Sequence, residues 1–296
     1  IPLTVTVRDS AGNPMPYAEF TLTRETTLDR SKATVNTSAD DLTVTALVPA
    51  NTNSVLAASG AKLIGTTGSD GKATFEVSQN ATTGLATPLT VTLARDTTKA
   101  ATLDVIYTVI TSPDSPSAKF WGHMPYTFTS STGVTFKRPL LKAETSSGSS
   151  ISSNGEVWSY MSNAQNLTST DCPLENQPRS NELLDLYSDH QNGTLMTDLG
   201  LPVYAGNWWA YDMVMLSGTS WTYQLISLKD GTITQKGTTS ALMLCLAQPH
   251  PAGVSVTLTS SAQDDARTTS NGGRPSASAK KGNSIPIVVT VKDRDG

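Results

Sequence analysis

A short run of aromatic and polar side chains, residues 207–212 (NWWAYD), is the part of this sequence best suited to bind a ligand. Tryptophan and tyrosine beside an amide and a carboxylate supply much of the binding energy at protein and glycan interfaces. The alternative is that one or both tryptophans fill a hydrophobic core, and we expect this of at least one. The candidate ligand-binding residues are Asn207, Trp208, Trp209, Tyr211 and Asp212.

The two cysteines, Cys172 and Cys245, could form one disulfide or remain as two buried thiols. An even number of cysteines in a chain with the composition of an exported protein favours the disulfide. Closing that loop would stabilise the fold by about 4 kcal/mol if the loop-entropy treatment applies.

Residues that carry catalysis or bind metals form no recognisable pattern. His123, His190 and His250 are far apart and lack the spacing of metal ligands. His123 stands among aromatic residues, which favours a packed, hydrogen-bonded side chain over a ligand. The sequence has no nucleophile elbow, zinc-protease helix, phosphate-binding loop or dinucleotide fingerprint. We therefore expect no catalytic residues, no metal and no cofactor, in a protein that is not an enzyme.

Composition points to an exported β-rich protein. Only 16% of residues are charged, below the usual quarter, and serine, threonine, glycine and asparagine replace them. The formal charge is −4 and there is no lysine- or arginine-rich block, so we expect no nucleic-acid partner. No apolar run reaches the ~18 residues of a membrane span, and neither end resembles a signal peptide. Targeting information would then lie outside this chain.

The two ends of the chain repeat each other. Residues 1–12 (IPLTVTVRDSAG) and 285–296 (IPIVVTVKDRDG) share seven of twelve positions, including the Asp-x-x-Gly turn. A length of 296 residues fits two domains and part of a third. We therefore expect domains at 1–111 and 112–250, with 251–296 beginning the next repeat of a longer parent protein.

The first domain is predicted to be a β-sandwich. Alternating apolar residues mark several short strands, and Gly68-Ser-Asp-Gly71 is a strong hairpin signal. The stretches VTVRDSAGNPMPYAEFTL and GTTGSDGKATFEV resemble the bacterial immunoglobulin-like repeats of the invasin/intimin adhesins. Such a repeat has one strand more than residues 1–111 supply, at its start. Residues 253–259 (GVSVTLT) look like that strand of the next repeat, so we expect an exposed edge in the first domain.

The second domain is predicted to be α+β and holds all five tryptophans. Apolar spacing suggests a helix over 156–166 and another over 181–189, capped by Ser180. Residues 145–155 are expected to form a flexible loop and 135–141 a strand. The region resembles the C-type lectin-like module of the invasin/intimin adhesins, through Trp158, SNELLDLY (180–187), GNWWAYDMVML (206–216) and ALMLCL (241–246). In that family a disulfide joins the places held here by Cys172 and Cys245.

The resemblance implies an immunoglobulin-like sandwich followed by a C-type lectin-like domain, in a mainly β segment of a bacterial surface adhesin. It implies display outside the cell, with the parent anchored in the outer membrane by a region outside this chain. The calcium-ligating clusters of sugar-binding C-type lectins are missing, as they are in intimin-type modules. In the best-known family members the lectin-like module ends the chain, whereas here another repeat follows it.

Three functions fit these expectations. A receptor-binding module for a host-surface protein or glycan would carry an exposed aromatic or apolar patch. A purely structural stalk repeat, in contact with neighbouring immunoglobulin-like repeats, would have a polar surface and a tight interface around residues 108–118. A calcium-independent glycan-binding module would have a shallow groove lined by tryptophans.

Overall fold

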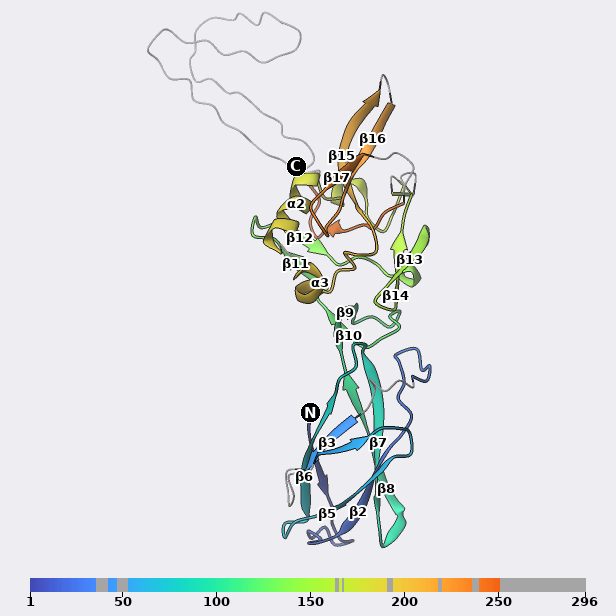
Figure 1. The fold of residues 1–296 in the computed structure, drawn as a ribbon, viewed down its shortest axis with the longest axis vertical. Helices are drawn as coiled ribbons and strands as arrows, with labels where there is room; N and C mark the ends of the chain where they lie inside the picture. The colour runs from blue at the N-terminus through green and yellow to red at the C-terminus, as the bar shows by residue number, and fades with distance from the viewer. Residues whose placement is uncertain are drawn as a thin grey trace, which may run out of the picture.

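The chain forms two modules that follow one another along an elongated body (Figure 1). The computed structural model describes residues 1–35, 42–46, 53–162, 165–166, 168–190, 194–217, 220–235 and 240–250. The segment 251–296, predicted to begin another repeat, lies outside these residues. The domain limits at 111 and 250 stay predictions.

The first module is a sandwich of two antiparallel sheets, ordered β1-β6-β3-β4 and β5-β2-β7-β8. Its strands are β1 (Pro2–Thr6), β2 (Glu19–Arg24), β3 (Leu42–Ala46), β4 (Asn53–Leu56), β5 (Lys62–Thr66), β6 (Lys72–Gln79), β7 (Leu85–Leu93) and β8 (Asp96–Tyr107). Alternate residues of β2 and β6 are buried, the period-two pattern that the sequence shows. The inward side chains of both sheets make one core, which includes Phe20, Leu22, Val44, Phe75 and Val77.

The turn at Gly68–Gly71 is present, but it does not close a hairpin. Gly71 has a φ of 72° and donates its N–H to the carbonyl of Gly68. The strands on either side, β5 and β6, belong to different sheets, since β5 pairs with β2 and β6 with β1 and β3. The predicted hairpin is therefore wrong: the turn carries the chain from one layer of the sandwich to the other.

The second module combines short sheets with two α-helices. Its strands are β9 (Val109–Pro113), β10 (Gly122–Met124), β11 (Thr127–Thr129), β12 (Thr135–Lys137), β13 (Ser149–Ser153), β14 (Glu156–Tyr160), β15 (Trp208–Ser217), β16 (Ser220–Ile226), β17 (Ile233–Gln235) and β18 (Cys245–Leu246). The 3₁₀ turns are η2 (Lys142–Glu144) and η3 (Leu174–Asn176), and the α-helices are α2 (Ser180–Asp189) and α3 (Thr194–Leu199). The strands form sheets β11-β12-β18 and β15-β16-β17 and the pairs β9-β10 and β13-β14.

Helix α2 occupies the place predicted for a helix at 181–189. Leu183 and Leu186 are buried in the core of the module, and Leu184 and Tyr187 pack against it. The predicted cap is displaced by one position, because Arg179 rather than Ser180 precedes the first helical residue. The hydroxyl of Ser180 instead bonds the carboxylate of Asp212.

The sequence predicts a loop at 145–155 and a helix at 156–166, and both predictions are wrong where the two segments adjoin, because a β-hairpin forms there. Residues 156–160 form strand β14, which pairs with β13 across a turn at Asn154-Gly155. Both turn residues have positive φ, 53° and 77°, as the tight turn of a hairpin requires. Trp158 is fully buried and Val157 faces outward, whereas the helical interpretation placed Val157 inside.

Candidate functional site

The two tryptophans of the candidate ligand-binding segment are core residues. Both Trp208 and Trp209 are fully buried, and the indole N–H of Trp209 donates to the carbonyl of Met161 at 2.8 Å. Trp208 packs in the main core of the module. The idea that they act as an exposed aromatic hot spot is therefore wrong, because β15 enters the interior at its first three residues, all buried.

Asn207 and Asp212, at either end of the segment, bond within the fold. The backbone carbonyl of Asn207 accepts the N–H of Leu242 at 2.8 Å. The carboxylate of Asp212 accepts both the backbone N–H and the hydroxyl of Ser180, the first residue of α2. A carboxylate beside the N-terminus of a helix accepts a free N–H of the first turn and interacts favourably with the positive end of the helix dipole. Asp212 therefore fixes the start of α2.

Tyr211 is the one predicted site residue whose aromatic ring is exposed. Its side chain is 38% exposed, and its ring centre lies 6.4 Å from that of the buried Tyr223. Its backbone N–H donates to the carbonyl of Pro178 at 2.8 Å, which holds β15 against the segment before α2. Burial, with a smaller effect of Tyr211, raises the pKa of Tyr223. Tyr211 therefore presents its ring from a fixed backbone, as a contact residue needs to.

Two further tyrosines of the second module are exposed and were not singled out by the sequence. Tyr204 is 59% exposed and has Lys229 5.6 Å from its ring centre, and Tyr126 is 61% exposed with Arg138 at 5.9 Å. A cation over an aromatic ring contributes about 0.5–1 kcal/mol at such exposed sites. No local sequence pattern predicts that these two tyrosines are exposed, because tyrosine is intermediate between typically buried and typically exposed residues.

The tryptophan-lined groove expected of a glycan-binding module does not form from the tryptophans whose side chains the structure describes. Trp158, Trp208 and Trp209 are fully buried. Trp121 is half-buried beneath Arg30, at the junction between the modules.

The predicted disulfide between Cys172 and Cys245 is present, with the Cα atoms 5.7 Å apart. Cys172 follows the β14 region and is fully buried, and Cys245 begins β18, which pairs with β12. Between the cysteines along the chain lie α2, α3 and the whole sheet β15-β16-β17. The bond therefore closes the loop that contains the candidate segment.

The three histidines bond separate partners. His123 is exposed, not packed as expected, and bonds the hydroxyl of Thr108. His190 approaches Asp198, and His250 approaches the carbonyl of Gln177. Within the described ranges, no three histidine, cysteine, aspartate or glutamate side chains gather as a metal site would require. No helix in these ranges has the length and apolarity to cross a bilayer.

A loop of the first module reaches the second module at the junction. The backbone N–H of Arg30 donates to the carbonyl of Lys119 at 2.9 Å. Its guanidinium bonds Asp114 at 2.8 Å and lies 4.8 Å from the ring centre of Trp121. The ion pair itself contributes little, because Asp114 is mostly exposed. The stacked guanidinium and the backbone bond fix the direction in which the second module leaves the first.

Backbone hydrogen bonds also join the two modules at the junction. The N–H of Trp121 donates to the carbonyl of Gly84 in the first module, and its carbonyl accepts the N–H of Val109. A Cβ atom on Gly84 would lie 1.6 Å from the Trp121 carbonyl oxygen. Only glycine leaves room for this approach, so the junction depends on the residue type at position 84.

A buried carboxylate organises the second module just beyond the junction. Glu156, only 2% exposed, accepts the hydroxyl of Ser112 at 2.7 Å and the N–H of Phe120 at 2.9 Å on one oxygen. Its other oxygen accepts the N–H of Lys119 at 3.0 Å. The Glu156 side chain, which belongs to β14, thereby joins β14 both to β9 and to the segment that precedes β10. A tight interface around residues 108–118, as predicted, would require such contacts.

Comparisons with known proteins agree with this two-module arrangement. Residues 113–246 match the InvE adhesion domain family, and residues 1–110 match the family described as bacterial immunoglobulin-like 21. The solved structure of the adhesin InvE from Yersinia pseudotuberculosis is similar over 81% of this chain, with a TM-score of 0.63 and 23% sequence identity. The chain spans 65% of the length of that structure's chain. No curated protein matches. The likeness confirms the predicted fold class, an immunoglobulin-like sandwich followed by a lectin-like domain.

Proposed function

Because the chain is a segment of an invasin/intimin-like cell-surface adhesin, we propose that its second module contacts a receptor while its first module holds that module in place. The receptor would be a protein or glycan on a host surface. We further propose that the parent protein is anchored in the outer membrane by a region outside this chain. The protein then acts by binding, without catalysis.

One observation carries the proposal: sheet β15-β16-β17 lies at the end of the second module that points away from the first (Figure 1). Hairpin β15-β16 extends beyond the helices there. Tyr211 lies in β15 near the point where the strand leaves the core, with its ring exposed and its backbone fixed by Pro178. An exposed aromatic ring held in one position loses little conformational entropy on binding, which suits a contact residue.

The test measures binding of the full chain to mammalian cell surfaces and to a glycan array, for wild type and Tyr211→Ala. Truncation of a contact tyrosine at an interface centre costs about 2 kcal/mol or more, so we expect affinity to fall about 30-fold. The matched control is Tyr126→Ala, an exposed tyrosine between β10 and β11. This variant should bind like wild type.

The outcomes separate the alternatives. Equal binding by wild type and Tyr211→Ala would remove Tyr211 and its surroundings from the receptor site. Equal losses in both tyrosine variants would indicate general damage to the surface instead of a local site. Absence of binding by the folded wild-type chain would refute the receptor-contact function.

A structural spacer is the second candidate function. The junction favours it, because Arg30, Gly84 and Trp121 fix how the two modules meet. In this alternative the chain sets distance and direction for binding modules elsewhere in the parent protein. It requires that the Tyr211 surface contacts no receptor.

A further inference from the structure

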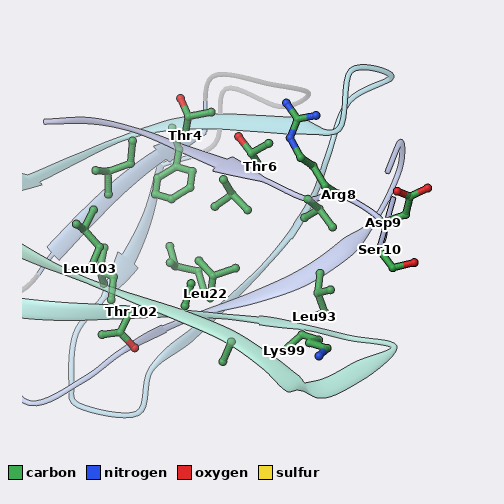
Figure 2. A pocket seen from close by; sticks show the side chains of 18 residues that line it. Thr4, Thr6, Arg8, Asp9, Ser10, Leu22, Leu93, Lys99, Thr102 and Leu103 are labelled. Atoms are coloured by element: carbon green, nitrogen blue, oxygen red, sulfur yellow. The ribbon is translucent and has the colours of Figure 1, made fainter. Parts of the chain in front are cut away.

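Strand β5 forms one edge of the sheet β5-β2-β7-β8, because among the described residues it pairs only with β2. Figure 2 shows Leu22 of β2 directed into the space between the two sheets of the sandwich. Side chains alternate along a strand, so Thr21 and its partner on β5, Ile64, face outward. Ile64 is 68% exposed, more than any other large aliphatic side chain in the described part of the chain. The edge therefore presents an apolar side chain to solvent at its centre.

The backbone of β5 directs hydrogen-bonding groups toward this edge. The N–H of Thr67, just after β5, donates to the carbonyl of Ala18, and an equivalent bond forms at the other end of the strand. The odd-numbered residues of β5 therefore bond β2, and in an antiparallel pair the residues between them direct their N–H and C=O groups the other way. Lys62, Ile64 and Thr66 thus offer these groups to an added strand.

The edge of β5 is complementary to a second copy of itself. When two copies run antiparallel with Ile64 opposite Ile64, Lys62 of each lies opposite Thr66 of the other. Each facing pair can exchange two backbone hydrogen bonds, since all three residues direct these groups outward. The two isoleucines form an apolar cross-strand pair at the centre. Both chains use the same residues in this register, as the two-fold symmetry of a dimer requires.

Charged residues favour the same register. Glu19 of β2, which is exposed, pairs with Thr66 of β5. In the dimer Glu19 lies two strands from Lys62 of the copy, with about 10 Å between the Cα atoms, a distance that the two extended side chains span together. The contact forms twice by symmetry. A register that set Lys62 opposite Lys62 would be opposed by like charges. The charge pattern therefore selects a copy of this edge, aligned at Ile64.

Antiparallel pairing determines where the two molecules point. Figure 1 shows β7 and β8 running along the long axis of the body, and β2 is antiparallel to both β7 and β5, so β5 follows the same axis. A copy that pairs antiparallel with β5 therefore directs its second module the opposite way. Chains displayed on one cell surface point in the same direction. This pairing would join chains displayed on two facing surfaces.

We propose that β5 pairs with β5 of a second copy, in the register centred on Ile64, and thereby joins chains displayed on facing cells. A single strand pair buries little area, so each contact is weak and many copies must act together. The inference rests on display at the cell surface and not on receptor binding by the second module. Receptor binding at Tyr211 can fail without affecting it, and the reverse also holds.

The first experiment measures the mass of the full chain by sedimentation equilibrium over a range of concentrations. We expect a monomer–dimer equilibrium. Ile64→Lys should raise its dissociation constant at least about tenfold, because two like charges replace the apolar pair. The matched control is Val55→Lys, which changes a valine that is 58% exposed on the edge strand β4 of the other sheet and should associate like wild type. A chain that is monomeric at its highest soluble concentration, or equal behaviour of the two variants, would overturn the proposal.

A charge exchange tests the register. Lys62→Glu sets two carboxylates near each other at both ends of the paired strands, so we expect the dissociation constant to rise about fivefold. Adding Glu19→Lys to the same chain restores opposite charges at both places and should restore wild-type association. A double variant that associates no better than Lys62→Glu would refute the proposed alignment.

Cross-linking and bead clustering test the pairing directly. Both native cysteines are joined to each other, so an introduced cysteine is the only free thiol. Ile64→Cys should form a disulfide-linked homodimer, because facing Cα atoms of a bonded pair lie about 5.5 Å apart. Lys62→Cys should not, because its two copies would lie about 13 Å apart along the ladder. Beads coated with the chain should cluster, and beads coated with Ile64→Lys should stay dispersed. A stronger cross-link through Lys62→Cys, or clustering that survives Ile64→Lys, would overturn the proposal.

Discussion

Replacing Glu156 by glutamine tests whether a carboxylate is required in the second module just beyond the junction. Three donors meet its two oxygens: the Ser112 hydroxyl and Phe120 N–H on one, and the Lys119 N–H on the other. A carboxylate only accepts hydrogen bonds, whereas a glutamine amide presents an NH₂ donor in place of one oxygen. The less costly orientation sets that NH₂ against the Lys119 N–H, which leaves one partly buried backbone donor without a partner.

The expected cost follows from this count. An unpaired N–H costs about 1–3 kcal/mol when it is buried, and the partly buried Lys119 N–H falls at the low end of that range. The two remaining bonds also lose the strengthening given by a charged acceptor. We expect Glu156→Gln to lower the free energy of unfolding of the second module by about 2–4 kcal/mol. Urea unfolding followed by tryptophan fluorescence measures this directly, because all five tryptophans lie beyond residue 111.

The matched control is Glu76→Gln, at an exposed position on β6. An exposed substitution of this kind changes stability by no more than about 0.5 kcal/mol. If Glu156→Gln unfolds within that same margin of wild type, the reasoning from donor count is refuted, and the carboxylate contributes no more than a neutral acceptor would.

Two further predictions concern the same region. Burial alone would raise the pKa of Glu144, but hydrogen bonds from Arg138, Ser115 and the Leu141 N–H outweigh it and lower the pKa below its ordinary value of 4.5. Its stabilising contribution is complete above pH 4.5 and is lost as pH falls through the lower folded pKa, so unfolding at several pH values should show a shallower acid loss in Glu144→Gln. Gly84→Ala should loosen the junction and raise the radius of gyration measured by small-angle scattering. Gly68→Ala is the control, because its Cβ would come no closer than 3.3 Å to its neighbours, and it should leave the radius of gyration unchanged. Equal scattering profiles for the two variants would contradict this prediction.

The residue types at two turns, Asn154-Gly155 and Gly68–Gly71, show how far local sequence predicts this fold. Asn154-Gly155 is a strong hairpin signal, yet the apolar spacing of Val157, Tyr160 and Met161 also fits a helix, and this spacing is what predicts a helix there. Pairing with β13 decides in favour of the strand. At Gly68–Gly71 the turn itself was correct, but which sheet each flanking strand joins depends on distant partners that a short sequence window does not contain.

The candidate site was located less well than the fold. Helix α2 and the pairing of Cys172 with Cys245 follow from periodicity and from the family resemblance, and both are present. Trp208 and Trp209 could equally have been surface or core residues, because sequence composition alone does not determine which way a strand enters the interior. The contacts of Glu156 depend on donors up to 44 residues away, and no local pattern predicts them.

The disulfide has a mechanical consequence. When tension acts between residues 1 and 250, the load passes from β9 along the chain to Cys172 and then directly through the sulfur bridge to Cys245. The residues between the cysteines carry no load along their backbone, so a contour length of about 240–260 Å cannot be drawn out. Hairpin β15-β16 and Tyr211 lie within this unloaded loop. A receptor bound there would stay on a surface that the bridge holds together while the rest of the chain is pulled.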